Sequence, residues 1–258
     1  MENRLEEGTV ETHVADGIAT IAFSHPAQNS LPGRLLDLLA TAIEQAGSAG
    51  NVRVIILKSG GDRTFCAGAS FDELSAIQDL DSGKRFFLGF ARVINAMRKC
   101  PKLIIGRVQG KAVGGGVGLA AAADYCLATR AASVKLSELA VGIGPFVVGP
   151  AVARKIGESA MSQLAIDATE WRTAEWAYAK GLYAGLYDDP VEMDAAVEDL
   201  ARKLSSSSPE AMHELKSVFW QGTQDWDLLL EARAEISGRL VLSSFTKEAI
   251  ARFREKKA

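Results

Sequence analysis

The sequence has few residues that bind metals, form disulfides or titrate near neutral pH. Only three cysteines and three histidines occur in its 258 residues. The cysteines, Cys66, Cys100 and Cys126, form no CxxC pair and lack the spacing of zinc ligands, so we expect reduced thiols in a cytoplasmic protein. The histidines are dispersed along the chain, and together these absences predict that the protein has no metal site.

Long apolar runs and an excess of basic charge are also missing. No segment approaches the run of about 18 apolar residues that spans a bilayer, which excludes a membrane helix. The net charge of -3 argues against a nucleic-acid surface, because phosphate binding relies mainly on cations. The acidic start, MENRLEEGTVE, has no apolar targeting segment. We therefore expect no membrane and no nucleic-acid partner.

What the chain does contain is an alternation of strand-like and helix-like segments, long enough for one large domain. Alternating apolar residues on both sides of Asp16-Gly17 predict a β-hairpin. After Pro145 the pattern becomes mostly helical. Further strands are predicted at 52–61 and 102–110, and helices at 33–47 and 83–101. The pattern favours a layered α/β fold with a helical last third.

The stretch GKAVGGGVGLAAAAD, residues 110–124, is unusually rich in glycine and alanine and contains no histidine, cysteine or serine. It lacks the GxGxxG spacing of a dinucleotide fingerprint. It also fails as a phosphate loop, because Ala112 stands where serine or threonine should follow the lysine. From these residues alone two interpretations remain. Either small residues allow close helix packing, or bare backbone N–H groups must approach a ligand.

A second turn of small residues, TFCAGASFDEL at 64–74, also lies between a predicted strand and a predicted helix. Two N–H donors aimed at one oxygen stabilise the negative charge that develops there during a reaction. Loss of one donor typically costs about 10²–10³ in rate. The pair of turns therefore favours an oxyanion site over simple packing.

Together with HPAQNSL, KLSELAVGIGPF and the ending KEAIARFREKK, these two turns resemble the crotonase superfamily, the enoyl-CoA hydratase/isomerase family. The resemblance covers nearly the whole chain. It implies a crotonase (ClpP-like) spiral of ββα units over residues 1–195. Residues 196–258 would form a helical trimerisation region of the same domain that also covers the active site. The implied substrate is an acyl-CoA thioester, the implied assembly a homotrimer or homohexamer, and coenzyme A is part of the substrate, so no cofactor is expected.

The resemblance also assigns catalytic roles. The N–H groups of Ala69 and Gly115 match the two oxyanion donors of the family. Of the two glutamates that family hydratases carry, the first matches Gly118 and is therefore missing here, whereas the second matches Glu138. Five further positions match residues near coenzyme A, namely Asn29, Leu31, Ala67, Phe253 and Lys256. For Asn29 and Leu31 support of the turn is the alternative, and for the last two a solvated helix end.

Glu138 is the predicted proton shuttle. Its apolar neighbours in the sequence, such as Leu136 and Ile143, would desolvate the carboxylate and raise its pKa towards neutrality. The alternative is an ordinary surface glutamate paired with Lys135 or Arg130. The first interpretation requires a desolvated Glu138 carboxylate in the structure, and the second requires an ion pair with Lys135 or Arg130.

With one carboxylate, the economical reaction is a double-bond shift. Glu138 would remove a proton from C2 of a 3-enoyl-CoA and return it at C4. Hydration stays open, because losing one acid/base group, worth about 10²–10⁴ in rate, could leave a slow hydratase. Dienoyl-CoA isomerase activity is disfavoured, since Phe146 stands where those relatives carry an aspartate. An acyl-CoA decarboxylase, a thioesterase and a non-catalytic acyl-CoA-binding protein also stay open.

Overall fold

A six-stranded sheet forms the centre of the molecule in the computed structural model, which describes residues 7–255. Its strand order is β1-β2-β3-β5-β7-β9. The bounds are β1 Thr9–Ala15, β2 Ile18–Ser24, β3 Val54–Ser59, β5 Leu103–Val108, β7 Tyr125–Thr129 and β9 Gly185–Tyr187. Strand β1 is antiparallel to β2, which confirms the hairpin predicted at Asp16-Gly17, and the other neighbours are parallel.

A smaller parallel sheet has the order β4-β6-β8. Its strands are β4 Thr64–Cys66, β6 Lys111–Val113 and β8 Val134–Lys135. Each small strand directly follows one large-sheet strand in the chain, and each is followed by a helical segment. The strand–strand–helix unit thus repeats, which is the spiral of ββα units that the sequence predicted.

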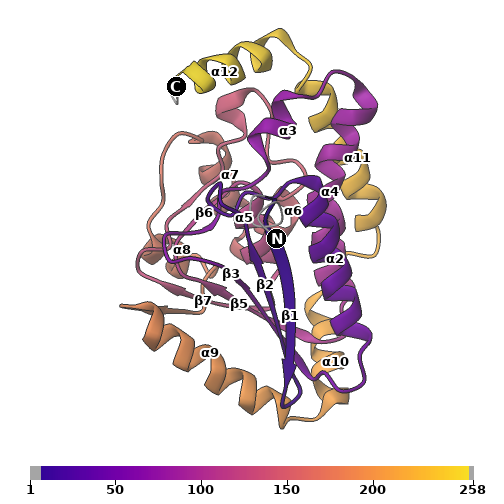
Figure 1. The fold of residues 1–258 in the computed structure, drawn as a ribbon, viewed down its shortest axis with the longest axis vertical. Coiled ribbons are helices and arrows are strands. Elements are labelled where there is room, and N and C mark those ends of the chain that lie inside the picture. Colours follow the sequence, from indigo (N-terminus) through magenta and orange to yellow (C-terminus); the bar gives the residue numbers. More distant parts are fainter. Residues whose placement is uncertain (1–6, 256–258) are drawn as a thin grey trace.

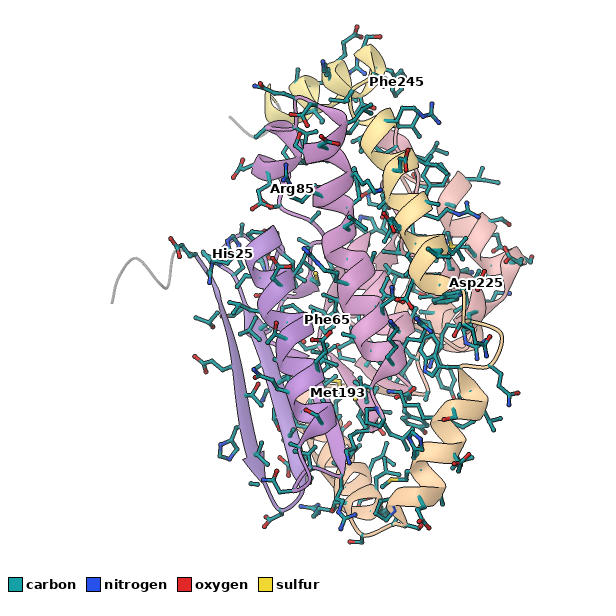
Figure 2. All side chains as sticks on the ribbon, turned by 90° about the vertical axis from the view of Figure 1, so that its right-hand side faces the viewer. His25, Phe65, Arg85, Met193, Asp225 and Phe245 are labelled. Carbon is teal, nitrogen blue, oxygen red and sulfur yellow. The ribbon has the colours of Figure 1, made fainter. Side chains whose placement is uncertain are left out.

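Helices cover the large sheet on both faces (Figure 1). On one side α2 (Gly33–Ser48), α4 (Leu80–Lys99) and α11 (Trp226–Leu240) run side by side, as Figure 2 shows from a second direction. On the other side α9 (Pro190–Ser205) packs against β3, β5 and β7. The remaining helices are α3 Phe71–Ser75, α5 Gly115–Ala122, α6 Gly149–Ile156, α7 Glu158–Ile166, α8 Ala174–Ala179, α10 Pro209–Phe219 and α12 Ser244–Glu255, and Leu139–Val141 forms a 3-10 turn, η1.

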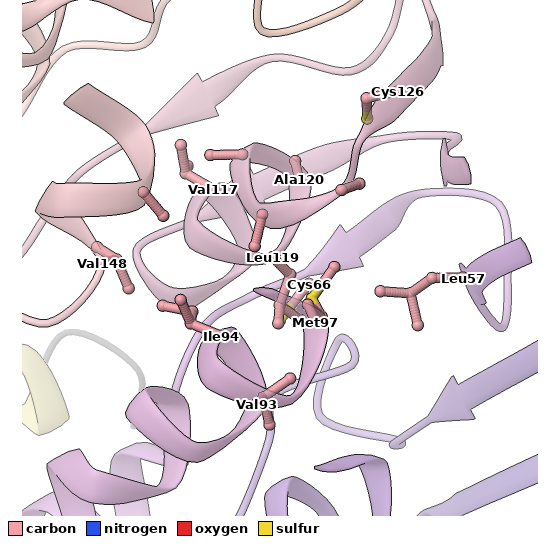
Figure 3. Close-up of a cluster of buried hydrophobic side chains, with 14 of the residues drawn as sticks. Leu57, Cys66, Val93, Ile94, Met97, Val117, Leu119, Ala120, Cys126 and Val148 are labelled. Atoms are coloured by element: carbon pink, nitrogen blue, oxygen red, sulfur yellow. The ribbon is translucent and has the colours of Figure 1, made fainter. Parts of the chain in front are cut away.

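The helix that starts in the glycine run, α5, lies inside the main hydrophobic core. All eight of its residues are buried. Figure 3 shows Val117, Leu119 and Ala120 of α5 within one apolar cluster that also holds Ile94 from α4 and Val148. Close packing of small residues is therefore a feature of this helix.

The helical last third is tied to the sheet by a buried polar group, Asp124. Its carboxylate accepts hydrogen bonds from the Ile104 N–H at 2.8 Å, Lys216 Nζ at 2.9 Å and Trp220 Nε1 at 3.0 Å. Only 3% of the Lys216 side chain and 4% of the Asp124 side chain are exposed. A buried ion pair held by further hydrogen bonds fixes α10 against β5, so the tail belongs to the same packed unit.

The structure also departs from the sequence prediction. Strand β9, three residues long, was not expected in the helical third, and it exists because β7 offers a parallel edge to Gly185–Tyr187. The boundary expected between residues 195 and 196 falls inside α9, so the chain packs across it without a break. Within residues 7–255, every helix is too short or too polar to cross a membrane.

Candidate active site

The glycine run ends in a helix N-terminus whose first N–H group is free. The Gly114 N–H donates to Lys135 O at 2.9 Å, which joins the run to β8. Gly115 is the first residue of α5, where an N–H has no acceptor within the helix, and no acceptor for it lies elsewhere in the described chain. A Cβ at Gly115 would overlap the ring of Phe90. Glycine is therefore required here by packing as well.

The second turn leaves the N–H of Ala69 free in a different way. Ala69 forms a parallel bridge with Leu31, in which Leu31 N–H donates to Gly68 O at 2.8 Å and Ser70 N–H donates to Leu31 O at 3.3 Å. Because successive peptide groups of an extended segment point to opposite sides, the Ala69 N–H points away from Leu31. It has no acceptor among the described residues.

The two free N–H groups lie on adjacent turns. Gly68 has a φ of 91°, and a Cβ added there would stand 3.0 Å from Val113 O and 3.6 Å from the Gly115 nitrogen. The peptide before Ala69 therefore runs directly alongside the start of α5. The structure places the turns of Ala69 and Gly115 side by side, and the role of their N–H groups as donors to one oxygen stays a prediction.

Glu138 brings a carboxylate to the same place. A Cβ at Gly114 would stand 2.9 Å from Glu138 Oε1. The residue as a whole is partly exposed, but its Oε2 is buried and has no hydrogen-bond partner. The surface-pair alternative is wrong, because Lys135 Nζ donates to Thr169 O and Arg130 pairs with Asp188 and Glu175.

Burial determines the protonation of this carboxyl group. Desolvation, offset in part by the residue's own backbone N–H, raises the pKa of Glu138 from 4.5 to about 7. The cause is the environment and not a neighbouring charge. Of the apolar neighbours expected from the sequence, Leu136 and Ile143 are buried, whereas Leu139 is 48% exposed. A carboxyl group of this pKa exchanges protons readily near neutral pH.

Gly118, the position that matches the missing glutamate, lies against the hydrocarbon side chain of Val148. Gly118 lies one turn after Gly115 on α5, and a Cβ there would stand 2.6 Å from Val148 Cγ1. Val148 is 4% exposed and Phe90 6% exposed, so both are core residues. The face of α5 beside the two turns is therefore apolar, and Glu138 is the carboxylate that reaches the glycines.

Comparisons with known proteins identify the family of this chain. The family model described as enoyl-CoA hydratase/isomerase matches residues 13–258. The chain belongs to the enoyl-CoA hydratase/isomerase family. It is therefore an enzyme of the lyase or isomerase type with the crotonase fold, as the sequence predicted.

Individual members of the enoyl-CoA hydratase/isomerase family show the degree of similarity. The chain is 27% identical over 242 residues to a probable enoyl-CoA hydratase of Bacillus subtilis, covering 93% of both chains. It is 33% identical over 201 residues to human mitochondrial methylglutaconyl-CoA hydratase, covering 76% of this chain and 59% of that one. Its fold matches the enoyl-CoA hydratase of Bacillus halodurans with a TM-score of 0.86 at 21% identity, covering 94% and 99%.

The residues predicted to lie near coenzyme A are placed as follows. The Asn29 side chain donates to Gly60 O at 2.7 Å and to Thr64 O at 2.8 Å and accepts from the His25 N–H, so its amide supports the turn. Leu31 is fully buried. The Ala67 N–H donates to Gln28 O at 3.1 Å. The Phe253 side chain and Lys256 lie outside the described part of the structure, and all five roles towards coenzyme A stay predictions.

A surface cavity of about 360 Å³ lies beside the Asn29 turn. It is lined by residues of segments 24–29 and 60–64, which the Asn29 side chain joins, and the Gln109 side chain donates to Thr64 O of the second segment. Ala69, Gly115 and Glu138 are not among its lining residues. The cavity therefore adjoins the start of the turn at 64–74 and does not include the candidate catalytic residues.

Two contacts around the site could not be located from the sequence, although a covering role of the C-terminal region was expected. Helix α12 packs on η1, the turn that starts after Glu138, and a Cβ at Gly142 would stand 2.5 Å from the Phe245 ring. Ser70 accepts a hydrogen bond from the Glu73 N–H at 3.3 Å and so caps α3. The first contact joins segments that lie far apart in the sequence, whereas the second lies within the turn at 64–74. The only sequence signal was the Ser-x-x-Glu spacing of a capping box at 70–73.

Cys66 lies inside the second turn but has no reactive character. It is fully buried, and burial raises the pKa of its thiol to about 12. The thiol is therefore protonated at neutral pH and cannot act as a nucleophile. A Cβ at Gly116 would stand 2.5 Å from Cys66 O and 2.8 Å from Cys66 Cβ, so this cysteine packs the two turns together.

Proposed function

We propose that this enzyme isomerises a 3-enoyl-CoA thioester to its 2-enoyl isomer. The observation that carries the proposal is the Glu138 carboxylate, whose Oε2 is buried and unpartnered, beside the turns that hold the free N–H groups of Ala69 and Gly115. An acyl-CoA thioester as the substrate class agrees with membership of the enoyl-CoA hydratase/isomerase family.

The first step is removal of a proton from C2 of the 3-enoyl thioester by the Glu138 carboxylate. The electrons of the C–H bond move into the conjugated system, and negative charge develops on the thioester oxygen. The N–H groups of Ala69 and Gly115 both face this oxygen and stabilise the dienolate. Gly115 stands at the N-terminus of an eight-residue helix, whose dipole adds to the stabilisation.

The second step returns the same proton at C4. The double bond moves from C3–C4 to C2–C3, the charge leaves the thioester oxygen, and Glu138 is ionised again. No atom is gained or lost, so the reaction needs neither water nor a second acid. A carboxyl group with a pKa of about 7 suits both steps, because it is neither too weak a base nor too weak an acid near neutral pH.

The apolar surroundings of Gly118 support isomerisation over hydration. Addition of water at C3 calls for a polar group that orients the water, and the matching position packs against Val148. Hydration is the second candidate, because two relatives at 27% and 33% identity are named as hydratases. In that case Glu138 would have to deliver both elements of water alone.

A paired absorbance assay separates the two candidates. The purified protein is given trans-3-enoyl-CoA and trans-2-enoyl-CoA separately, and absorbance of the conjugated thioester is followed. We expect absorbance to rise with the 3-enoyl ester and stay constant with the 2-enoyl ester. Glu138→Gln should lower the rate by about 10²–10⁴. Glu44→Gln, an exposed glutamate on α2, is the matched control and should leave the rate unchanged.

Different outcomes of the assay point to different reactions. Loss of absorbance from the 2-enoyl ester would make the enzyme a hydratase. Release of free coenzyme A would indicate a thioesterase. Release of carbon dioxide from a malonyl-type thioester, insensitive to Glu138→Gln, would indicate a decarboxylase. Thioester binding without turnover of any of these substrates would indicate a non-catalytic binding protein and contradict the proposal.

A further inference from the structure

The N-terminus of helix α2 has no capping group of its own. Its N-cap residue, Pro32, makes no side-chain capping bond, and its first turn holds no acidic residue. The cap comes from helix α3, where Glu73 Oε2 accepts a hydrogen bond from the Gly33 N–H at 2.8 Å. An N-terminal N–H lacks an acceptor within its helix, and the helix dipole favours a negative charge there. Glu73 therefore ties α3 to α2.

The same residue closes a ring of hydrogen bonds around Ala69. On one side of Ala69, Gly68 O accepts from the Leu31 N–H at 2.8 Å. On the other side, Ser70 N–H donates to Leu31 O and Ser70 Oγ accepts from the Glu73 N–H, both at 3.3 Å. The carboxylate bond to α2 completes the ring. The Ala69 N–H points away from Leu31 and out of this ring.

Helix α3 meets the rest of the molecule along an apolar side and a polar side. It is five residues long and none of its residues is buried. Its apolar side, with Phe71 and Leu74, packs only partly into a small cluster around Ile143 and Ile250. The polar side of α3 is joined to α2 by the Glu73 carboxylate. With this bond removed, the Leu31 bridge still holds the turn before α3, but the carboxylate no longer ties α3 to α2.

We infer that Glu73 is a positioning residue for the oxyanion donor Ala69. Its carboxylate is bonded to α2 and reaches none of the reacting atoms, so it acts through the placement of the Ala69 N–H. A donor that is displaced from the thioester oxygen stabilises the dienolate less, which lowers kcat more than it weakens binding. This inference rests on the proposed function, since it needs a thioester oxygen at the two N–H groups.

The test measures the hydrogen bonding of the bound thioester carbonyl and the rate of turnover separately. Hexanoyl-CoA labelled with carbon-13 at the thioester carbonyl is bound to each variant, and its NMR shift reports how strongly the carbonyl is hydrogen-bonded. We expect Glu73→Ala to reduce the carbonyl shift of the bound thioester. It should also lower kcat on trans-3-enoyl-CoA about tenfold, with KM changed less than twofold. This decrease in kcat is smaller than the decrease that loss of a whole donor causes.

Two further variants distinguish positioning from a general loss of structure. Glu73→Gln keeps an oxygen that accepts from Gly33, so it should restore most of kcat and of the carbonyl shift. Asp72→Ala removes the neighbouring exposed carboxylate and should leave both unchanged. If Glu73→Ala kept the wild-type carbonyl shift and the wild-type kcat, the inference about Glu73 would be overturned while the proposed function would stand. Binding of the thioester to the wild type with no carbonyl shift would overturn the proposed function and the inference with it.

Discussion

The carboxylate of Glu138 lies against the α-carbon of Gly114, so close that a methyl group at residue 114 would stand 2.9 Å from Oε1. The same glycine has a φ of 51° and a ψ of -113°, a conformation open only to glycine. One residue thus directs the chain into α5 and leaves room for the carboxylate. Gly114 therefore influences both the backbone path into α5 and the position of the Glu138 carboxylate.

The pH dependence of the reaction should report the titration of Glu138. The ionised form is needed to remove the C2 proton, and burial raises the pKa of the free enzyme's carboxyl to about 7. We expect kcat/KM to fall about tenfold for each pH unit below 7 and to level off above it. Initial rates with trans-3-enoyl-CoA from pH 5 to 9 check this. A profile that breaks near pH 4.5 would show that the carboxyl is not desolvated.

Glu138 should also make the protein less stable as pH rises. Between pH 4.5 and about 7 the folded state retains a proton that the unfolded chain has lost, so stability falls through this window. The full cost, on the order of 3 kcal/mol, is present above pH 7. Glu138→Gln removes it. We expect this variant to unfold at higher urea than the wild type at pH 8 and at nearly the same urea at pH 4.5, and equal midpoints at both pH values would contradict the prediction.

Gly114→Ala should impair catalysis through the displacement of Glu138. The new methyl group collides with Oε1 and also strains the backbone, at a cost of about 1–3 kcal/mol. We expect kcat to fall by about 10², because misplacement of a catalytic group by about 1 Å has effects of that size. Gly222→Ala is the matched control. Gly222 also has a positive φ, of 79°, but nothing lies within 4 Å, so melting temperature should drop while kcat is kept.

Restoring a carboxylate at residue 118 should require a second change. Gly118→Glu alone forces a side chain into Val148 and should cost about 1–3 kcal/mol of stability without producing a hydratase. The double variant Gly118→Glu, Val148→Gly opens the space and should consume trans-2-enoyl-CoA measurably faster than the wild type. Val148→Gly by itself is the control. Hydratase activity in the single Gly118→Glu variant would show that Val148 does not exclude the carboxylate.

The helical tail should depend on the buried pair of Lys216 and Asp124. Lys216→Met leaves the Asp124 carboxylate buried with one charge partner removed, which costs about 3–5 kcal/mol. Lys203→Met breaks an exposed pair with Asp199 and should cost less than about 1 kcal/mol. Urea unfolding of both variants measures the difference. Similar small losses in the two would mean that Asp124 is satisfied by Trp220 and the Ile104 N–H alone.

The sequence by itself determined the elements that depend on local pattern. The hairpin at Asp16-Gly17 follows from turn chemistry, and α2 and α4 follow from apolar spacing. The two small-residue turns pointed to free N–H groups, and the motif order pointed to the family. The apolar neighbours of Glu138 predicted a raised pKa, and the direction agrees with the structure, although the burial that causes it comes from the tertiary fold.

Only the tertiary structure decided which groups meet. Strand β9 forms because β7 presents an open edge, and no pattern in Gly185–Tyr187 predicts it. Other contacts join segments that lie far apart in the chain, such as the Glu73 bond to Gly33 and the contact of Val148 with Gly118. The burial of Glu138 Oε2 likewise depends on the tertiary fold. Such contacts depend on how helices and turns pack in three dimensions. Periodicity reports the face that a residue occupies but not the partner that lies opposite it.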